Sequence, residues 1–246
     1  MRIEPSPPCS GLAIHAYGST VALSIESVVE RPNCTVIGLG GGEIAVVEHL
    51  LAALWAAGID TASITVDGPE IPNKDGSSLP IHEALAGAGR IQAGLRTELK
   101  LRNTIRVEED GSFLQIEPAD TLSVDYSFSH PELGEQRYVA ILTREMAVTE
   151  ILPARSFITE SEAQAAAAAG FLHNNNAEDA LVLFVSGNQV RPASSLRFSD
   201  EFARHKVLDM LGDLYLAPFE WTGKVTAFRS GHRLNRMMAR ELVSSF

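Results

Sequence analysis

The sequence predicts an α+β protein made of two similar halves. Short segments with alternating β-branched residues indicate strands, and longer apolar segments with helical spacing indicate helices. The order of strands followed by helices occurs in residues 1–96 and again in residues 97–246. No low-complexity linker separates the two halves. We therefore expect two α+β domains, each a sheet packed on two helices, with a boundary near residues 95–99.

The first half is predicted to begin with two strand pairs. The second pair surrounds the glycine-rich turn at residues 38–43, which lacks both the G-K-[ST] and the G-x-G-x-x-G spacing of phosphate-binding loops. Gly58 has the position of a C-cap for the helix that follows. The predicted elements are a hairpin over residues 11–28, strands within 33–47, a helix over 46–58, a strand over 62–68, a turn-rich loop over 68–78 and a helix over 79–89.

The second half repeats this pattern with more strands. A hairpin is indicated by Glu109-Asp110-Gly111, a turn sequence between two alternating segments. The alanine-rich helix that follows is expected to end at Gly170. The predicted elements are a strand pair over residues 100–119, strands over 121–130 and 136–142, a helix over 161–171, a strand and turn over 180–192, a helix over 202–217, a strand over 223–231 and a helix over 232–246.

Composition excludes several functional classes. The 246-residue chain has a formal net charge of -11, which disfavours a nucleic-acid partner because phosphate contacts need a basic surface. No run of about 18 apolar residues is present, so no transmembrane segment is expected. Two cysteines outside a C-x-x-C pair and an N-terminus without an apolar signal region favour a cytoplasmic location. A monomer is the default expectation.

The segment over residues 202–217 carries polar residues on a predicted core helix. His205, Asp209 and Asp213 are spaced four residues apart and therefore share one helix face, with Lys206 beside the first of them. An imidazole and a carboxylate at this spacing can bind one zinc ion. The alternative is a solvated stripe on an amphipathic helix.

Other polar residues interrupt apolar or turn segments. Glu48 and His49 lie within an apolar helix, where a charged pair implies a partner, a metal or a cleft; the alternative is a satisfied core histidine beside a surface glutamate. His232 follows Ser-Gly at a strand end and is either a surface histidine or one that Asp213 orients. The remaining candidates are Ser156, as an oxyanion donor or a turn residue, and Asp75, as a partner for a lysine such as Lys206 or a turn residue.

Taken together, these segments resemble one family, the zinc-dependent UDP-3-O-acyl-N-acetylglucosamine deacetylases of lipid A biosynthesis. The stretches "VEHL", "PEIPNKDGS", "ARSF", "HKVLDMLGDL" and "SGH" carry the resemblance and occur in the order found in that family. The resemblance implies an active site between two helix layers and a small-molecule substrate, a UDP-amino-sugar that carries an acyl chain. It also implies a Zn²⁺ cofactor and hydrolysis of an acetamide with release of acetate.

The resemblance assigns a role to each matching residue. His49, His205 and Asp209 look like the zinc ligands, and Glu48 looks like the general base. His232 looks like the general acid, with Asp213 as its orienting partner. Ser156 stands where the family usually has a threonine that polarises the amide carbonyl, and Lys206 would lie near the oxyanion or the substrate phosphate. Phe157, Asp75 and Lys206 are the expected substrate-binding residues.

The chain departs from the family pattern outside this set. The first half is shorter than in typical members, and a basic residue expected in the second-half hairpin is replaced around Gly111, Ser112 and Phe113. Two alternatives therefore accompany the main interpretation. One is a zinc deacetylase of a different N-acetylated sugar nucleotide, and the other is a non-catalytic relative that binds zinc or a ligand.

Overall fold

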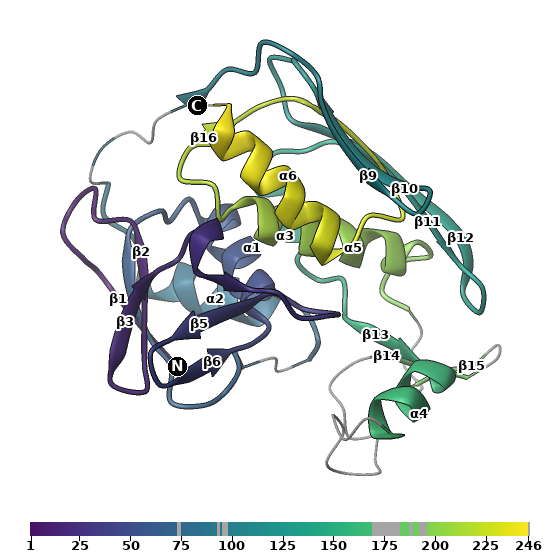
Figure 1. Ribbon diagram of the computed structural model, residues 1–246, viewed down its shortest axis with the longest axis horizontal. Helices are drawn as coiled ribbons and strands as arrows, with labels where there is room; N and C mark the ends of the chain where they lie inside the picture. Colours follow the sequence, from purple (N-terminus) through teal and green to yellow (C-terminus); the bar gives the residue numbers. More distant parts are fainter. Residues whose placement is uncertain are drawn as a thin grey trace.

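The computed structural model has a mixed α/β fold (Figure 1). It describes residues 1–72, 75–92, 94, 98–168, 183–186, 189–191 and 196–245. Within these residues there are six α-helices and five sheets. The α-helices are α1 (Val47–Ala57), α2 (Leu79–Ala88), α3 (Arg144–Glu150), α4 (Glu160–Ala168), α5 (Glu201–Leu214) and α6 (His232–Ser244). The coarse expectation of strands mixed with helices is confirmed.

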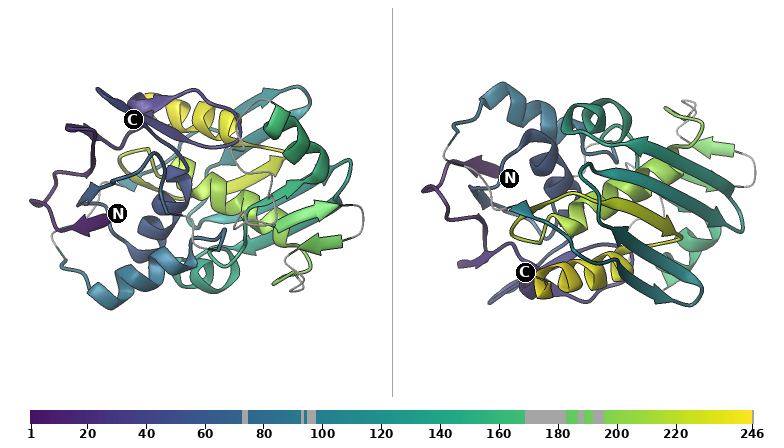
Figure 2. Two further views of the ribbon diagram at one scale, coloured as in Figure 1. Left: turned by 90° about the horizontal axis from the view of Figure 1, so that it is seen from below. Right: turned by 90° about the horizontal axis from the view of Figure 1, so that it is seen from above.

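The two largest sheets lie on opposite sides of the central helices in Figures 1 and 2. The four-stranded sheet has the order β1 (Arg2–Glu4), β7 (Ala62–Thr65), β2 (Leu12–Ala16), β3 (Ser19–Ala22). The five-stranded sheet has the order β12 (Gly134–Ile141), β11 (Ser123–His130), β17 (Lys224–Phe228), β10 (Ser112–Glu117), β9 (Ile105–Glu109). In each sheet one central pair is parallel, β2 with β7 and β11 with β17, and the other pairs are antiparallel.

Three smaller sheets complete the fold. The short strands of the first half form one beside the glycine turn, and a second projects from the body of the molecule together with α4 (Figure 1). Their strands are β4 (Val28–Val29), β5 (Val36–Leu39) and β6 (Gly42–Ile44), then β13 (Phe157–Thr159), β14 (Leu183–Ser186) and β15 (Gln189–Arg191), and finally the parallel pair β8 (Glu98–Leu99) and β16 (Glu220–Trp221).

Several expected elements differ in extent. The predicted hairpin over 11–28 ends with β3, and its remainder is the 3-10 helix η1 (Ile25–Ser27) followed by β4. The helix predicted over 202–217 ends at Leu214 and continues as a turn. The expected helix end at Gly170 and the boundary at residue 96 lie outside the described residues.

Several short elements were missed in the sequence, namely β1, β8, β13, β16 and α3. Strand β1 has three residues and pairs only with β7, so its alternation of inward and outward side chains is too short to recognise in the sequence. Helix α3 has seven residues, and its N-cap Thr143 accepts a hydrogen bond from the Met146 backbone N–H. A single capping residue before so short a helix is a weak signal.

Helix α1 is apolar on all sides and is almost completely buried. A helix with this composition must be enclosed by other elements, and α1 packs against α2, α3 and α5. Gly58 ends the helix in the left-handed conformation, with φ 67°, and its N–H reaches the carbonyl groups of Leu54 and Trp55, as the sequence predicts. At the other end Val46 has φ 60°, a strained backbone for a β-branched residue.

Helices α1 and α5 approach most closely at Gly212. A Cβ atom at this position would lie 2.1 Å from the Glu48 carbonyl oxygen, which is backbone and cannot rotate away. Glycine therefore sets the distance between the two helices that carry most of the predicted site residues.

Gly212→Ala is expected to destabilise the fold by about 3 kcal/mol, because α1 and α5 must separate to admit the methyl group. Denaturant unfolding measures this loss. Gly87→Ala is the matched control, since Gly87 lies in α2 and a methyl group there would meet no other atom within 4 Å, so this change should be neutral or slightly stabilising. Equal stabilities for the two variants would contradict the role given to Gly212.

Candidate active site

Three helices bring the predicted residues together at one buried place. Helix α1 contributes Glu48 and His49 from its first turn, and α6 contributes His232 from its first residue. Helix α5 contributes the residues predicted to share a face, and the structure buries that face against α1 and α6 instead of exposing it to solvent. These α5 residues are His205, Asp209 and Asp213, and the partly exposed Lys206 lies beside the first of them.

Two imidazoles and one carboxylate form the first part of the site. The His49 and His205 rings lie 5.3 Å apart between centroids. The Asp209 Oδ1 atom lies 3.4 Å from His205 Nε2 and 3.9 Å from His49 Nε2. All three side chains are buried, and their candidate ligand atoms lie within 4.8 Å of one another. This is a possible metal-binding cluster.

The donor set suits a metal cation. Asp209 Oδ1 is buried without a hydrogen-bond donor, so it is an unused acceptor close to the two rings. His205 Nδ1 lies 3.3 Å from the Ala154 carbonyl oxygen; a proton on Nδ1 donated to that oxygen leaves the Nε2 lone pair directed at the cluster. Two imidazole nitrogens and one carboxylate oxygen are a common ligand set for zinc.

The protonation states agree with this arrangement. Burial and, to a smaller extent, the neighbouring His205 lower the pKa of His49 to about 3, so the ring is neutral. Burial also lowers the pKa of His205. Burial would raise the pKa of Asp209, but its interactions with His205, Lys206 and His232 outweigh that effect and hold the pKa far below its usual range. Neutral imidazoles and an ionised carboxylate are the forms that bind metals.

A second set of groups lies on the α6 side of the cluster. His232 Nε2 lies 3.7 Å from Asp209 Oδ2 and 4.0 Å from Glu48 Oε1, and its Nδ1 lies 3.0 Å from Asp213 Oδ2. Glu48, Asp209 and His232 also satisfy the geometry of a cation-binding group. The expectation that Asp213 orients His232 agrees with the contact at Nδ1.

The pKa values of Glu48 and His232 are both raised, but for different physical reasons. Loss of solvent raises the pKa of Glu48 to about 7, and the charge of His232 opposes part of this rise. Burial alone would lower the pKa of His232, but the charge of Asp213 outweighs it and raises the pKa to about 9. A carboxylate that can accept a proton near neutral pH therefore lies beside an imidazolium that can donate one.

Lys206 contacts both the cluster and an aromatic residue. Its ammonium lies 2.9 Å from Asp209 Oδ2 and 5.2 Å from the centre of the Phe157 ring. Burial would lower the pKa of Lys206, but Asp209 raises it above its usual value, so the side chain is charged. The Phe157 ring lies edge-on to His205 at 5.9 Å between centroids and completes this side of the site.

Ser156 and the loop before α2 lie at the other side. Ser156 Oγ lies 3.4 Å from His49 Nε2 and 3.2 Å from the Gly76 carbonyl oxygen. Of the two interpretations of Asp75, the turn residue agrees with the structure, because Asp75 Oδ1 accepts hydrogen bonds from the Ser77 N–H and hydroxyl. The pairing with Lys206 was wrong: Asp75 Oδ2 accepts a hydrogen bond from Arg197 at 2.8 Å, and Lys206 contacts Asp209. Arg197 is the nearer cation because its segment packs against the loop that Asp75 belongs to.

Sequence reasoning missed four residues that support the site. Asn235 donates from Nδ2 to Asp213 Oδ2 at 2.9 Å, and its three-residue spacing from His232 on α6 was an available signal. Thr35 contacts Glu48 and Asp213, and nothing in its local sequence indicates this. Arg155 and Glu201 form a buried ion pair between the segment before Ser156 and the start of α5.

Glu201 is fully buried and accepts hydrogen bonds from four donors. These are the Arg155 backbone N–H, its Nε and its Nη2, and the Arg197 backbone N–H, at 2.6 to 3.1 Å. Burial would raise the pKa of Glu201, but the Arg155 side chain and the backbone donors outweigh it and lower the pKa. The ion pair therefore fixes the backbone next to Ser156 while Glu201 is ionised.

Glu201→Gln is expected to destabilise the protein by about 3–5 kcal/mol at pH 7, because it removes a buried carboxylate that accepts charge-assisted hydrogen bonds from the Arg155 side chain. In the wild type, the stabilisation from Glu201 is complete above the unfolded carboxyl pKa of about 4.3 and is lost as pH falls through the lower folded pKa. Denaturant midpoints from pH 7 to pH 3 measure both effects. The stability of the variant should fall less over that range than the stability of the wild type. Glu4→Gln, which breaks the exposed Arg2–Glu4 pair, should change little.

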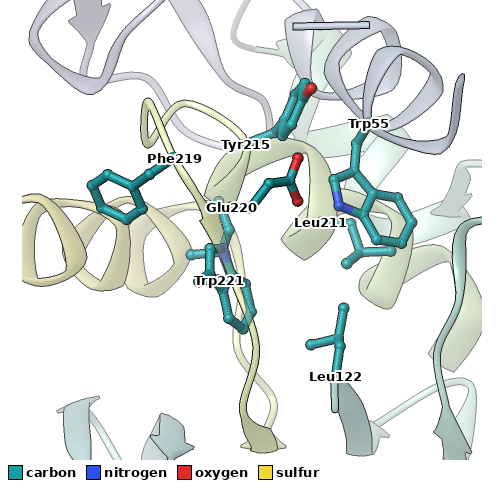
Figure 3. Close-up of a pocket in the computed structure, with 8 residues that line it drawn as sticks. Trp55, Leu122, Leu211, Tyr215, Phe219, Glu220 and Trp221 are labelled. Atoms are coloured by element: carbon teal, nitrogen blue, oxygen red, sulfur yellow. The ribbon is translucent and has the colours of Figure 1, made fainter. Parts of the chain in front are cut away.

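A small cavity lies at the opposite end of α1 from Glu48 and His49. Trp55 of α1 and Leu211 of α5 line it, and the Glu220 side chain points into it (Figure 3). The other lining residues are Leu122, Leu214, Tyr215, Phe219 and Trp221. The cavity shares no residue with the cluster, so it is a feature of the helix packing and not part of the candidate active site.

A mixed α/β fold with this buried set of groups defines a class, the hydrolases that can hold a metal ion beside a general base and a general acid. Comparison with known families gives the particular member of that class. The model for the family UDP-3-O-acyl N-acetylglycosamine deacetylase matches residues 1–244. The chain belongs to this family, as the sequence resemblance predicts.

Curated relatives support the same assignment. The UDP-3-O-acyl-N-acetylglucosamine deacetylase of Shewanella denitrificans is 36% identical over 253 residues, which cover 99% of this chain and 82% of the relative. The corresponding protein of Nautilia profundicola is 33% identical over 250 residues, covering 99% of this chain and 84% of the relative. That of Geotalea uraniireducens is 33% identical over 251 residues, covering 99% and 81%. This chain is therefore similar to these enzymes along almost its whole length.

Proposed function

We propose that this protein hydrolyses the acetamide of UDP-3-O-acyl-N-acetylglucosamine and releases acetate, a step of lipid A biosynthesis. Family membership supports the reaction class, and the relatives' names supply the substrate. The observation that carries the proposal is the single buried place where Glu48 and His232 flank the cluster of His49, His205 and Asp209. Proton acceptor, proton donor and metal-ligand set are then all present together.

We propose that His49, His205 and Asp209 hold a Zn²⁺ ion. The unpartnered Asp209 Oδ1 and the neutral rings support this choice of ligands. When bound, zinc would lower the pKa of water and polarise a carbonyl oxygen. The cation would also compensate the buried negative charge that Asp209 contributes.

Glu48 is the proposed general base. A water molecule attacks the acetamide carbonyl carbon, and the Glu48 carboxylate takes the proton that the water loses. The Thr35 backbone N–H already occupies Oε2, so Oε1 is the oxygen left to accept that proton. Because burial raises the pKa of Glu48 to about 7, its affinity for a proton is matched to this task.

His232 is the proposed general acid. As the C–N bond breaks, the imidazolium gives its Nε2 proton to the departing amine, and the products are acetate and the free amino sugar. Asp213 holds Nδ1 and thereby fixes the ring with Nε2 toward Glu48 and Asp209. The charge of Asp213 also keeps the ring protonated.

The remaining predicted residues are proposed to bind the substrate. Ser156, beside His49, would donate its hydroxyl to the carbonyl oxygen as negative charge develops there. Lys206 would attract that oxygen or a phosphate of the nucleotide. Phe157 offers a ring edge at the same side of the site, and Asp75, through Arg197, would hold the loop that borders it.

The finer architecture also belongs to this proposal. We propose two α+β domains of similar construction, residues 1–96 and 97–246, with the active site between their helix layers. The packing of α1 on α5, with one large sheet on either side, supports this division. A cytoplasmic, monomeric enzyme without a nucleic-acid partner remains our expectation. None of the described helices has the length and hydropathy needed to span a bilayer.

Acetate release tests the proposal. Zinc-loaded protein is incubated in separate reactions with UDP-3-O-acyl-N-acetylglucosamine and with UDP-N-acetylglucosamine, and Glu48→Ala is the control. We expect rapid release from the acylated substrate, little from the other, and none that exceeds background with the variant. A preference for UDP-N-acetylglucosamine would mean that the acylated sugar nucleotide is not the substrate of this protein. Zinc binding without any hydrolysis would favour the non-catalytic alternative.

A further inference from the structure

Thr35 is a fully buried polar residue in the segment that connects β4 to β5, directly before β5 begins. It lies outside the motifs that carry the family resemblance. All three of its hydrogen-bonding groups are used, and each one contacts α1 or α5. A buried threonine with this set of partners connects α1, which carries Glu48, with α5, which carries Asp213.

The backbone of Thr35 holds the first turn of α1 at two points. Its N–H donates to Glu48 Oε2 at 3.0 Å, and its carbonyl accepts from the Val47 N–H at 3.2 Å. Together these bonds fix both the helix end and the rotation of the Glu48 carboxylate. With Oε2 engaged, Oε1 is the atom that lies 4.0 Å from His232 Nε2.

The side chain of Thr35 reaches across to α5. Its hydroxyl donates to Asp213 Oδ1, while Oδ2 of the same carboxylate contacts His232 Nδ1 and Asn235 Nδ2. A carboxylate held at both oxygens cannot rotate, so the oxygen that orients His232 stays in place. Without the hydroxyl, Oδ1 would be a buried acceptor lacking this donor.

The segment that carries Thr35 is itself tied to α6, the helix of His232. Arg236 is buried and donates to the carbonyl groups of Arg31 and Cys34, each at 3.4 Å. The same guanidinium binds Glu30 Oε2 at 2.7 Å. The position of Thr35 is therefore set by the helix whose first residue it helps to orient.

We propose that Thr35 is a positioning residue for both proton-transfer groups, acting on Glu48 through its backbone N–H and on His232 through Asp213. This inference rests on the roles proposed above for Glu48 and His232. The two groups must be aligned with the same substrate amide in consecutive steps, and Thr35 contacts both the Glu48 carboxylate and the Asp213 carboxylate that orients His232. The side-chain half of this role is separable by mutation, because the backbone N–H remains in any variant.

Thr35→Val removes the hydroxyl and keeps the shape, and Thr35→Ser keeps the hydroxyl. We expect kcat for acetate release to fall by about tenfold or more in Thr35→Val, with KM within about twofold, because a lost buried hydrogen bond is worth roughly that factor. Thr35→Ser should recover most of the rate. Thr222→Val is the matched control, since its hydroxyl donates to a carbonyl at an exposed place, and it should leave kcat unchanged.

Combining Thr35→Val with Asp213→Asn distinguishes a positioning role of Thr35 from a general loss of stability. If the Thr35 hydroxyl acts through Asp213, Thr35→Val should lower kcat much less in that background than in the wild type. Equal losses in both backgrounds, or wild-type kcat in Thr35→Val, would overturn the assignment. Should Thr35→Val fail to fold, the comparison of Thr35→Ala with Thr35→Ser in the same two backgrounds decides the question.

Failure of the proposed function has a different signature. Wild-type protein that releases no acetate would overturn the function and the role of Thr35 together. An active wild type with an equally active, folded Thr35→Val would overturn the role of Thr35 alone. Zinc content, measured for every variant, should stay at the wild-type value because Thr35 contacts none of the proposed ligands directly.

Discussion

Glu48→Gln is expected to lower kcat for acetate release by about 10²–10⁴-fold, the usual contribution of a general base. Glutamine keeps the shape and can still accept the Thr35 N–H, but its amide cannot take a proton from water. Because the change also removes a buried charge, folding stability should not fall. Steady-state kinetics and thermal unfolding measure the two quantities on the same preparation.

Metal content must be followed in this variant, because Glu48 lies next to a proposed ligand. Glu48→Gln should retain wild-type zinc, which separates loss of the base from loss of the ion. Glu43→Gln is the matched control, since Glu43 pairs with Arg31 at an exposed place, and its kcat should equal that of the wild type. A Glu48→Gln protein with more than about a tenth of wild-type activity would assign proton abstraction to another group.

His49→Ala is expected to lose both the bound zinc and the activity. Removing one of three protein ligands leaves two, and the fourth position of a catalytic zinc is needed for water. Elemental analysis after dialysis measures bound zinc per chain, and the same sample is assayed for acetate release. His82→Ala changes a partly exposed histidine on α2 and should keep both at wild-type values.

The two readouts of His49→Ala discriminate between possible arrangements of the site. Metal loss together with activity loss agrees with His49 as a ligand. An active His49→Ala protein free of metal would contradict zinc-dependent hydrolysis. Full zinc binding in an inactive variant would place the ion elsewhere, for example among Glu48, Asp209 and His232, the second buried set with suitable geometry.

The predictable part of the fold consists of elements with strong local signals. Helices α1 and α6 have clear apolar spacing, and α1 ends at Gly58, where the chain requires a positive φ. Strand β1 and helix α3 have only three and seven residues, and their formation depends on partners distant in the sequence. Local pattern cannot supply that information.

The site shows the same division between local and distant information. The four-residue spacing on α5 predicts that His205, Asp209 and Asp213 share a face, and the structure agrees. Bringing His49 to that face depends on the packing of α1 against α5, which the residues alone did not give and the family resemblance implied. The pairing of Asp75 with Lys206 was wrong because each has another partner, Arg197 for Asp75 and Asp209 for Lys206, and spacing along the chain gives no distance between a loop and a distant helix.

Supporting residues were the hardest to predict. Thr35 and Glu201 act through contacts with residues far away in the chain, and each of them is an ordinary residue in its own segment. Their effect depends on burial, which raises the cost of a missing partner. Spacing rules apply within one helix or strand, so they cannot identify a residue whose partners lie in other elements.

The proposed ligands come from two helices that are far apart in the sequence, since His49 lies in the first turn of α1 and His205 and Asp209 lie on α5. An ion held there would be a cross-link between the N-terminal and C-terminal parts of the chain. Only the folded molecule brings all three ligands together, so metal binding is coupled to folding. Free zinc at 100 times its dissociation constant would add about 2.7 kcal/mol to the free energy of unfolding. Chelation would therefore lower the melting temperature as well as the reaction rate, and zinc supply in the cell would affect how long the protein survives proteolysis.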